Sequence, residues 1–217
     1  MLSTKIICTI GPASNSPKKL AELAEAGMNI ARLNFSHGTH HSHKKIIEQI
    51  RKLNKDRQYP IAIMLDTQGP EIRTGDKVIT LISGKRVCVT IPPNEESEGT
   101  LFVNYVDLKD DLKEGSCISL DGGLISLKVC GKNKKGLDCE VIDGGVVKAH
   151  RHVNLPGAIV KLPGITETDK RDIFFGIEQK VDVIALSFVR SSETIREVRA
   201  SLGVHAQQIK LIAKIEN

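Results

Sequence analysis

The sequence has 217 residues, of which 40% are hydrophobic and 26% charged, so it is long enough for one or two globular domains with a sizeable core. The net charge is only +5, tryptophan is absent and aromatic residues amount to 3%, which argues against a nucleic-acid partner held by base stacking. No signal peptide precedes the first expected strand and no apolar run is long enough to span a bilayer, which argues against a membrane partner.

Alternating strand and helix patterns occupy the first third of the chain. Lys5–Ile10 (KIICTI) is apolar and rich in β-branched residues, which predicts a buried parallel strand. Ser16 followed by Pro17 indicates the start of a helix, with a capping residue and then a proline in the first helical position. The pattern continues with a strand, a helix and another strand, over residues 29–36, 40–54 and 61–65.

The strand that starts at Asn29 contains two alternating sets of side chains. One set is polar and the other apolar: Arg32, Asn34 and Ser36 against Ala31, Leu33 and Phe35. Successive side chains of a strand point to opposite faces, so the polar set should project together. A cation and two oxygen-bearing side chains at a strand end could bind an anion, a metal ion or both. The alternative is a half-buried antiparallel strand with one solvated face.

The pattern changes after Arg73. Short alternating runs punctuated by Gly, Asn and Asp extend to about Pro156, which predicts a compact all-β module. The chain also contains five cysteines, an odd number without a C-x-x-C pair. This usage argues against a disulfide framework or a zinc site and favours a reducing compartment, the cytoplasm.

The β/α pattern returns at Gly164. Thr166 and Asp169 form a T-x-x-D capping box, and the helix that follows should bury Ile173, Phe174 and Ile177. A strand, a helix and a last strand are then expected over residues 181–189, 192–202 and 209–215.

The spacing of the strands predicts the fold. They begin near residues 5, 29, 61, 181 and 209, and all gaps except the one before residue 181 match one β/α unit of about 30 residues. We therefore expect an α/β fold in which a small β domain is inserted after the third strand, giving barrel segments 1–73 and 158–217 around an inserted domain 74–157. The repeat fits strands 1–5 of a (β/α)8 TIM-type barrel, or else an open doubly wound sheet. The sequence stops directly after an apolar strand, so we expect a truncated barrel.

Polar residues follow the expected strands, at the ends where barrel enzymes place their chemistry. They are Arg32, Asn34 and Ser36, then Asp66 and Thr67, then Ser187, and finally Lys214 and Glu216. Lys214 and Glu216 are two positions apart and should share a face. They could form a structural ion pair, or a lysine beside a metal-ligating carboxylate that serves phosphoryl transfer.

Five segments of the chain, taken together, resemble one enzyme family. KIICTIGPAS, MNIARLNFSHGTH, LDTQGPEIRTG, VNLPG and KLIAKIEN are similar to pyruvate kinases, and the likeness covers nearly the whole chain. The resemblance implies a transferase of glycolysis that moves the phosphoryl group of phosphoenolpyruvate to ADP, giving pyruvate and ATP. It also implies Mg²⁺ (or Mn²⁺) and K⁺ as cofactors, and a cytoplasmic homotetramer with a further C-terminal regulatory domain.

The resemblance assigns roles at the reacting phosphoryl group. Arg32 and Arg73 correspond to arginines that hold it, and bidentate guanidinium groups suit that task. Lys214 corresponds to the catalytic lysine, which neutralises charge on the phosphoryl group and on the enolate. Ser187 would bind substrate, and Glu216 would be one Mg²⁺ ligand.

The resemblance also implies a monovalent-cation site and a nucleotide site. The expected K⁺ ligands are Asn34, Ser36, Asp66 and the carbonyl of Thr67. The expected nucleotide contacts are Pro12, Asn34, His37, Asp121 and Arg151. Glu71 stands where a glutamate accompanies K⁺ dependence in this family and a lysine accompanies independence.

The sequence departs from the family pattern at several positions. Gln68 replaces a common lysine, Gly122 replaces a second aspartate of the inserted domain, and Arg151-His152 replaces a usual Lys-Gly pair. These departures concern the nucleotide contacts. The second acidic Mg²⁺ ligand of the family would lie beyond Asn217.

Two rival functions stay open at this point. The first is a metal-dependent lyase or aldolase on a similar barrel, against which the inserted domain and the paired arginines argue. The second is a folded module without catalytic activity. Because five of eight strands cannot close a barrel, we expect the 217-residue chain by itself to be inactive.

Overall fold

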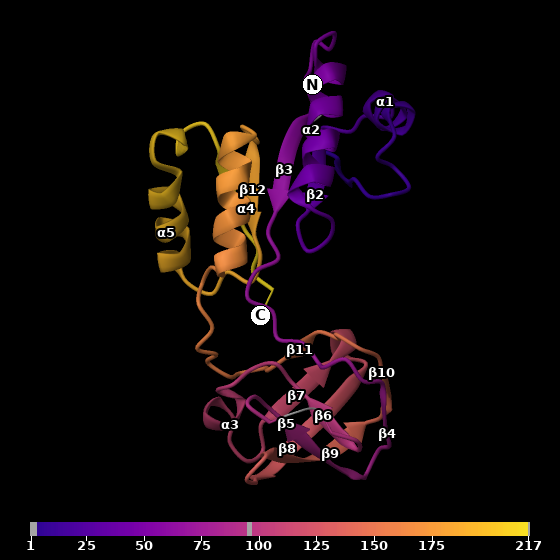
Figure 1. The fold of residues 1–217 in the computed structure, drawn as a ribbon, viewed down its shortest axis with the longest axis vertical. Helices are drawn as coiled ribbons and strands as arrows, with labels where there is room; N and C mark the ends of the chain where they lie inside the picture. Colours follow the sequence, from indigo (N-terminus) through magenta and orange to yellow (C-terminus); the bar gives the residue numbers. More distant parts are fainter. Residues whose placement is uncertain (1–3, 95–96, 217) are drawn as a thin grey trace. The chain divides into compact units, whose positions relative to one another are not determined.

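The structure, a computed structural model, describes residues 4–94 and 97–216. These residues divide into two compact units, one formed by residues 4–70 and 163–216 and the other by Glu71–Leu162 (Figure 1). Each unit has its own hydrophobic core.

The first unit is built on one parallel sheet. Its strands are β1 (Ile7–Thr9), β2 (Ile30–Asn34), β3 (Ala62–Asp66), β12 (Val183–Leu186) and β13 (Lys210–Ala213). They pair in the order β1-β2-β3-β12-β13, so the strands predicted from the repeat are confirmed and lie side by side in chain order. Parallel neighbours in chain order, joined by helices, are the arrangement that the β/α repeat predicts.

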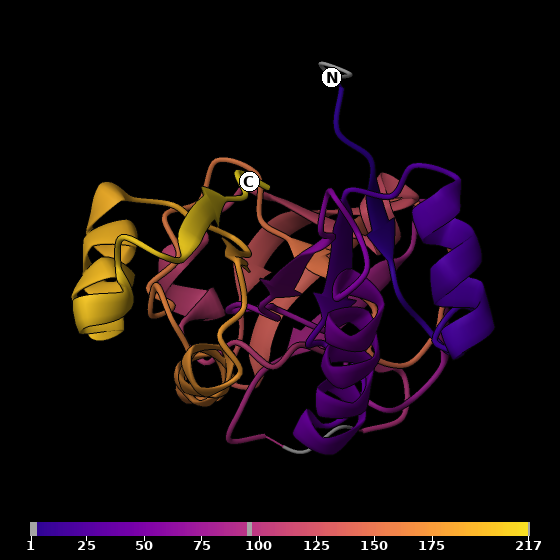
Figure 2. The same ribbon diagram turned by 90° about the horizontal axis from the view of Figure 1, so that it is seen from above.

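Four α-helices cover one face of this sheet. They are α1 (Pro17–Glu25), α2 (His40–Asn54), α4 (Glu167–Glu178) and α5 (Ser192–Leu202), the last followed by the short helix η2 (Gly203–His205). In Figure 2 the four helices, coloured from indigo to yellow, follow one another in an arc around the strands. Ser16 caps α1 and a reciprocal capping box between Thr166 and Asp169 starts α4, as the sequence predicted. No helix among the described residues is long and apolar enough to cross a membrane.

The alternation in β2 sorts its side chains between two faces. Ala31, Leu33 and Phe35 join the apolar cluster beneath the helices. Ile30, on the opposite face, packs with a small cluster that includes Met64 and Ala185. Arg32 and Asn34 share the parity of Ile30 and therefore lie on the face without helices. The expected strand over residues 29–36 is shorter, since β2 ends at Asn34 and Ser36 lies in the turn that follows.

Two details of the first unit differ from expectation. Phe174 is 61% exposed while Phe175 is buried, because Phe175 stacks against His40 and packs near Phe35. Helical spacing alone cannot choose between two adjacent phenylalanines. The expected burial of the first strand is also incomplete, since Ile7 of β1 is 49% exposed. Ile212 of β13 is 38% exposed as well, because β1 and β13 are the two edges of the sheet.

The second unit consists mainly of short strands. Its elements are β4 (Ile79–Leu81), β5 (Arg86–Thr90), β6 (Thr100–Phe102), α3 (Leu108–Asp111), β7 (Cys117–Leu120), η1 (Asp121–Gly123), β8 (Ile125–Lys132), β9 (Gly136–Asp143), β10 (Gly145–Val147) and β11 (Val153–Asn154). One sheet has the order β11-β7-β8-β9-β5-β6, and β10 pairs with β4. The alternating residues of these strands bury one apolar cluster. The unit is not purely β, since it includes the single-turn helix α3.

Candidate active site

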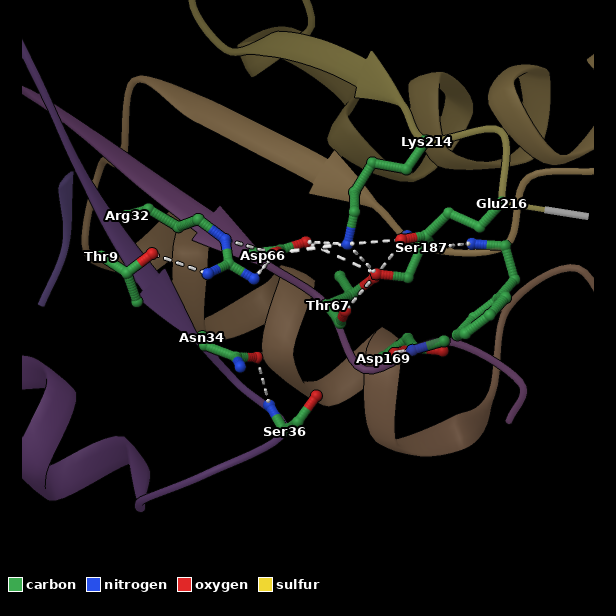
Figure 3. Close-up of polar contacts among 12 residues, drawn as sticks. Thr9, Arg32, Asn34, Ser36, Asp66, Thr67, Asp169, Ser187, Lys214 and Glu216 are labelled. Atoms are coloured by element: carbon green, nitrogen blue, oxygen red, sulfur yellow. Dashed lines mark hydrogen bonds and ion pairs between the residues drawn. The ribbon is translucent and has the colours of Figure 1, made fainter. Parts of the chain in front are cut away.

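Four polar side chains meet at the carboxyl ends of the parallel strands (Figure 3). Asp66, which is 1% exposed, lies between two cations. Its Oδ2 is 2.5 Å from Arg32 Nη2 and 2.6 Å from Arg32 Nε, and its Oδ1 is 3.0 Å from Lys214 Nζ. The Lys214 ammonium also donates to Ser187 Oγ at 2.8 Å. Two cations share one carboxylate here, so these four side chains carry one net positive charge, which the Glu216 carboxylate beside Lys214 balances.

Ser187 joins β12 to the loop that follows β3. Its hydroxyl donates to the carbonyl oxygen of Thr67 at 2.6 Å, and its backbone N–H donates to Thr67 Oγ1 at 3.2 Å. The residue is buried. Because this hydroxyl donates to Thr67 and accepts from Lys214, it fixes the ammonium group relative to the loop after β3.

Glu216 lies beside Lys214, as the two-residue spacing predicted. Glu216 Oε1 is 3.4 Å from Lys214 Nζ, and Glu216 Oε2 accepts the backbone N–H of Phe188 at 3.1 Å. Phe188 has a φ of +55°, in the left-handed region that a bulky residue rarely adopts. A strained backbone that holds a candidate ligand in place is a feature common at functional sites.

The candidate cation ligands on the other side of the cluster are oxygen donors. Asn34 Oδ1 accepts the backbone N–H of Ser36 at 3.1 Å, and the Phe35 N–H donates to the Asp66 carbonyl at 2.9 Å. Asn34 is in register with Asp66 across β2 and β3. Amide, hydroxyl, carboxylate and carbonyl oxygens are the donors that hard cations prefer, so the chemistry of this set fits K⁺. The Glu216 carboxylate by the same reasoning fits Mg²⁺.

Two expected nucleotide contacts lie in turns of the first unit. Pro12 is in the turn after β1, and the His37 N–H donates to the Asn34 carbonyl at 3.3 Å in the turn after β2. The nucleotide roles of Pro12 and His37 stay predictions.

The remaining predicted residues belong to the second unit. Arg73 Nη2 pairs with the Glu71 carboxylate at 2.5 Å, and its Nη1 donates to the carbonyl of His150 at 2.7 Å. Arg151 Nη1 is 3.5 Å from Asp121 Oδ1. The structure therefore brings together Arg73 with Glu71, and Arg151 with Asp121, each pair within that unit.

Sequence reasoning overlooked two residues of the first unit. Thr9 Oγ1 accepts from Arg32 Nη1 at 2.7 Å, and Thr9 is in register with Arg32 across β1 and β2. The alternation of side chains along the expected first strand could have indicated this contact. Asp169 was interpreted only as a helix cap, but its Oδ1 also accepts the N–H of Gly69 at 2.9 Å. No local pattern indicates a contact over such a distance along the chain.

A buried histidine supports the turn that follows β2. His43 Nε2 lies 2.8 Å from the carbonyl oxygen of His37, and its ring stacks on Phe35 with centroids 4.1 Å apart. Burial lowers the pKa of His43, despite the opposing effects of the His37 carbonyl and of Asp172, and His40 lowers it further. The Nε2 contact requires the proton on that nitrogen in the neutral ring, so the second proton would enter at Nδ1, which is buried.

We expect the free energy of unfolding to fall as the pH drops below about 6.5, the ordinary pKa of histidine. In that window the unfolded chain takes up a proton at His43 while the folded chain, whose pKa is lowered, does not. Urea unfolding at pH 7.5 and 5.5 measures the change. His43→Gln should reduce this pH dependence, while His41→Gln, an exposed position on the same helix, should preserve it. Equal pH dependence in both variants would contradict the assignment.

Comparison with known proteins points to one family. The model of the pyruvate kinase barrel domain matches residues 1–217. A pyruvate kinase of Geobacillus stearothermophilus is 48% identical over 220 residues, which cover 99% of this chain and 38% of the relative. A pyruvate kinase of Sporosarcina psychrophila is 46% identical over 223 residues, covering 100% and 38%. Plastidial pyruvate kinase 2 of Arabidopsis thaliana is 44% identical over 217 residues, covering 99% and 38%. The chain thus spans about 38% of the length of these curated relatives.

Proposed function

Because the chain belongs to the pyruvate kinase family, we propose that it contributes to transfer of the phosphoryl group of phosphoenolpyruvate to ADP. In this reaction the bond between phosphorus and the enol oxygen breaks while a bond to a terminal oxygen of ADP forms. The enolate that is left then takes up a proton to give pyruvate. Phosphoryl transfer of this kind depends on positioning and on neutralising charge rather than on covalent catalysis by the protein.

The cluster of Arg32, Asp66, Lys214 and Ser187 is the observation that carries the proposal. Asp66 and Ser187 hold the Lys214 ammonium in place, and Asp66 also orients the Arg32 guanidinium. A phosphoryl group seated between these cations would find its charge partly neutralised before the reaction begins. Lys214 would also stabilise the negative charge that develops on the enolate oxygen.

Cations complete the proposed chemistry. Glu216 would hold Mg²⁺ or Mn²⁺, which neutralises phosphate charge when bound. Asn34, Ser36, Asp66 and the Thr67 carbonyl would hold K⁺. The oxygen donors described above support both assignments.

The proposed nucleotide contacts and the proposed role of the second unit are based on the family resemblance. Pro12, Asn34, His37, Asp121 and Arg151 would contact ADP, and Arg73 would hold the phosphoryl group. Residues 74–157 would be an inserted lid domain, and the rest would be the first five strands of a (β/α)8 barrel in a homotetramer. A cytoplasmic location agrees with the five cysteines, all of which are free thiols.

The 217-residue chain by itself is proposed to be inactive. The sheet of the first unit has two open edges, β1 and β13, which do not pair with each other. A closed barrel has no such edges, and unpaired edges tend to associate with other strands. Mg²⁺-dependent formation of pyruvate by the purified 217-residue chain would contradict this part of the proposal.

The proposed function is tested in an extended protein, in which residues 1–217 are followed by the portion of a pyruvate kinase that the match does not cover. We expect it to form pyruvate from phosphoenolpyruvate only when ADP and Mg²⁺ are present. Replacing K⁺ with Na⁺ should reduce turnover by at least tenfold, since Glu71 matches the K⁺-dependent pattern. Turnover that is indifferent to K⁺ would contradict the cation site. Conversion of phosphoenolpyruvate or a related acid without ADP would favour the rival lyase.

A further inference from the structure

Asp169 occupies a position that capping alone does not explain. Its carboxylate is 2% exposed and accepts hydrogen bonds from two separate parts of the chain. Oδ2 accepts from the backbone N–H of Thr166 at 2.9 Å and from Thr166 Oγ1 at 2.7 Å, which completes the capping box of α4. Oδ1 accepts from the backbone N–H of Gly69 at 2.9 Å, across 100 residues of sequence. A charged acceptor makes these bonds stronger than bonds between neutral groups.

Gly69 is also confined by Ser187 and Phe188, the two residues that follow β12. A Cβ atom at this position would lie 2.9 Å from Ser187 Cβ, from the Ser187 carbonyl oxygen and from Phe188 Cδ2. Its φ of +75° also favours glycine. Gly69 thus donates to the Asp169 carboxylate and has no room for a side chain beside Ser187 and the Phe188 ring.

Ser187 and Phe188 are in turn the residues that hold the site at the end of β13. Ser187 Oγ accepts from Lys214 Nζ at 2.8 Å, and the Phe188 N–H donates to Glu216 Oε2 at 3.1 Å. Figure 3 shows Asp169 close to Thr67 and Ser187, with Lys214 and Glu216 beyond them. Asp169 binds the loop after β3 at Gly69, and Ser187 binds the same loop at Thr67. Through this loop the start of α4 is connected to Ser187 and so to Lys214.

We propose that Asp169 is a positioning residue that fixes the loop after β3 and, through Ser187 and Phe188, the two functional side chains at the end of β13. Asp169 contacts no reacting atom in this role. The geometric part of the inference depends only on the described contacts, and its catalytic consequence rests on the proposed function.

The experiment separates positioning from capping. Asp169→Asn replaces one acceptor oxygen with an NH2 group that would face a donor, so the side chain can no longer serve both Thr166 and Gly69. The matched control is Thr166→Val, which removes the capping hydroxyl but keeps the carboxylate on Gly69. Both variants should lose helix-capping stability to a similar extent, because each disrupts the same capping box.

Amide hydrogen exchange in the 217-residue chain gives the first readout. In Asp169→Asn, we expect the protection of the Gly69 and Phe188 N–H groups to fall at least tenfold further than in Thr166→Val. Exchange through global unfolding would accelerate equally in two equally destabilised variants, so the difference reports the local contacts. Equal protection at Gly69 and Phe188 in the two variants would overturn the proposal.

A second variant is available if Asp169→Asn does not fold. Gly69→Ala crowds Ser187 and Phe188 directly, and we expect it to reduce protection of the Phe188 N–H, because its Cβ would displace the Ser187 carbonyl and the Phe188 ring. Unchanged protection at Phe188 in this variant would overturn the proposal equally.

The extended protein gives the kinetic readout. Asp169→Asn should lower kcat about tenfold, while Thr166→Val leaves kcat within twofold. A kcat unchanged in both variants would contradict the catalytic consequence. If the unmodified extended protein shows no phosphoryl transfer, the proposed function fails, and the amide exchange still decides the positioning role.

Discussion

Replacing Lys214 with methionine is expected to lower kcat for phosphoryl transfer by about 10³-fold, or about 4 kcal/mol. Methionine keeps the length of the side chain but removes the ammonium group, which lies 2.8 Å from Ser187 Oγ and 3.0 Å from Asp66 Oδ1. The charge of the transferring phosphoryl group and of the enolate would then lack its nearest neutralising partner. Initial rates of pyruvate formation in the extended protein measure the effect.

The matched control for this variant is Lys210→Met. Lys210 is the exposed first residue of β13, and Lys214 directly follows the last residue of that strand. Its replacement removes the same charge from the chain but should leave kcat within twofold. If both variants lose activity to the same degree, net charge rather than the placed ammonium group explains the result, and the role of Lys214 is wrong.

Replacing Asp66 with alanine is expected to destabilise the first unit by about 3 kcal/mol. Asp66 is the only carboxylate that pairs with Arg32 among the described ion pairs, and its removal would leave that guanidinium and Lys214 repelling each other. The side chains of Arg32 and Lys214 are 29% and 28% exposed, so partial hydration keeps the loss at the lower end of that seen for broken buried ion pairs. Urea unfolding at pH 7 measures the change.

Asp56→Ala provides the control for Asp66, since Asp56 is exposed just after α2. Its replacement should change the free energy of unfolding by less than about 0.5 kcal/mol. In the extended protein, Asp66→Ala should also abolish the K⁺ effect on turnover. A variant with unchanged stability and an unchanged response to K⁺ would exclude Asp66 from both the ion-pair cluster and the cation site.

Local patterns were sufficient to predict the elements of the first unit. The strand spacing predicted five parallel strands, and Ser16-Pro17 and the Thr166/Asp169 box predicted two helix starts, because capping depends on residues within one helical turn. The alternation in β2 predicted that Arg32 and Asn34 share one face and Ala31 and Leu33 the other, because strand parity is a property of the backbone. The structure shows that the apolar face is the one beneath the helices.

Only the tertiary structure decided how these side chains are used. The sequence could place Asp66 and Lys214 at strand ends, but their contact joins residues 148 apart, and the one between Asp169 and Gly69 joins residues 100 apart. Which of two adjacent phenylalanines packs in the core was likewise decided by Phe35 and His40, far along the chain. The sequence by itself determined the elements, their faces and the residue types at the strand ends, because each depends on backbone geometry over a few residues. The sharing of Asp66 between two cations and the second role of Asp169 required the fold, because hydrogen bonds between distant segments leave no periodic signal in the sequence.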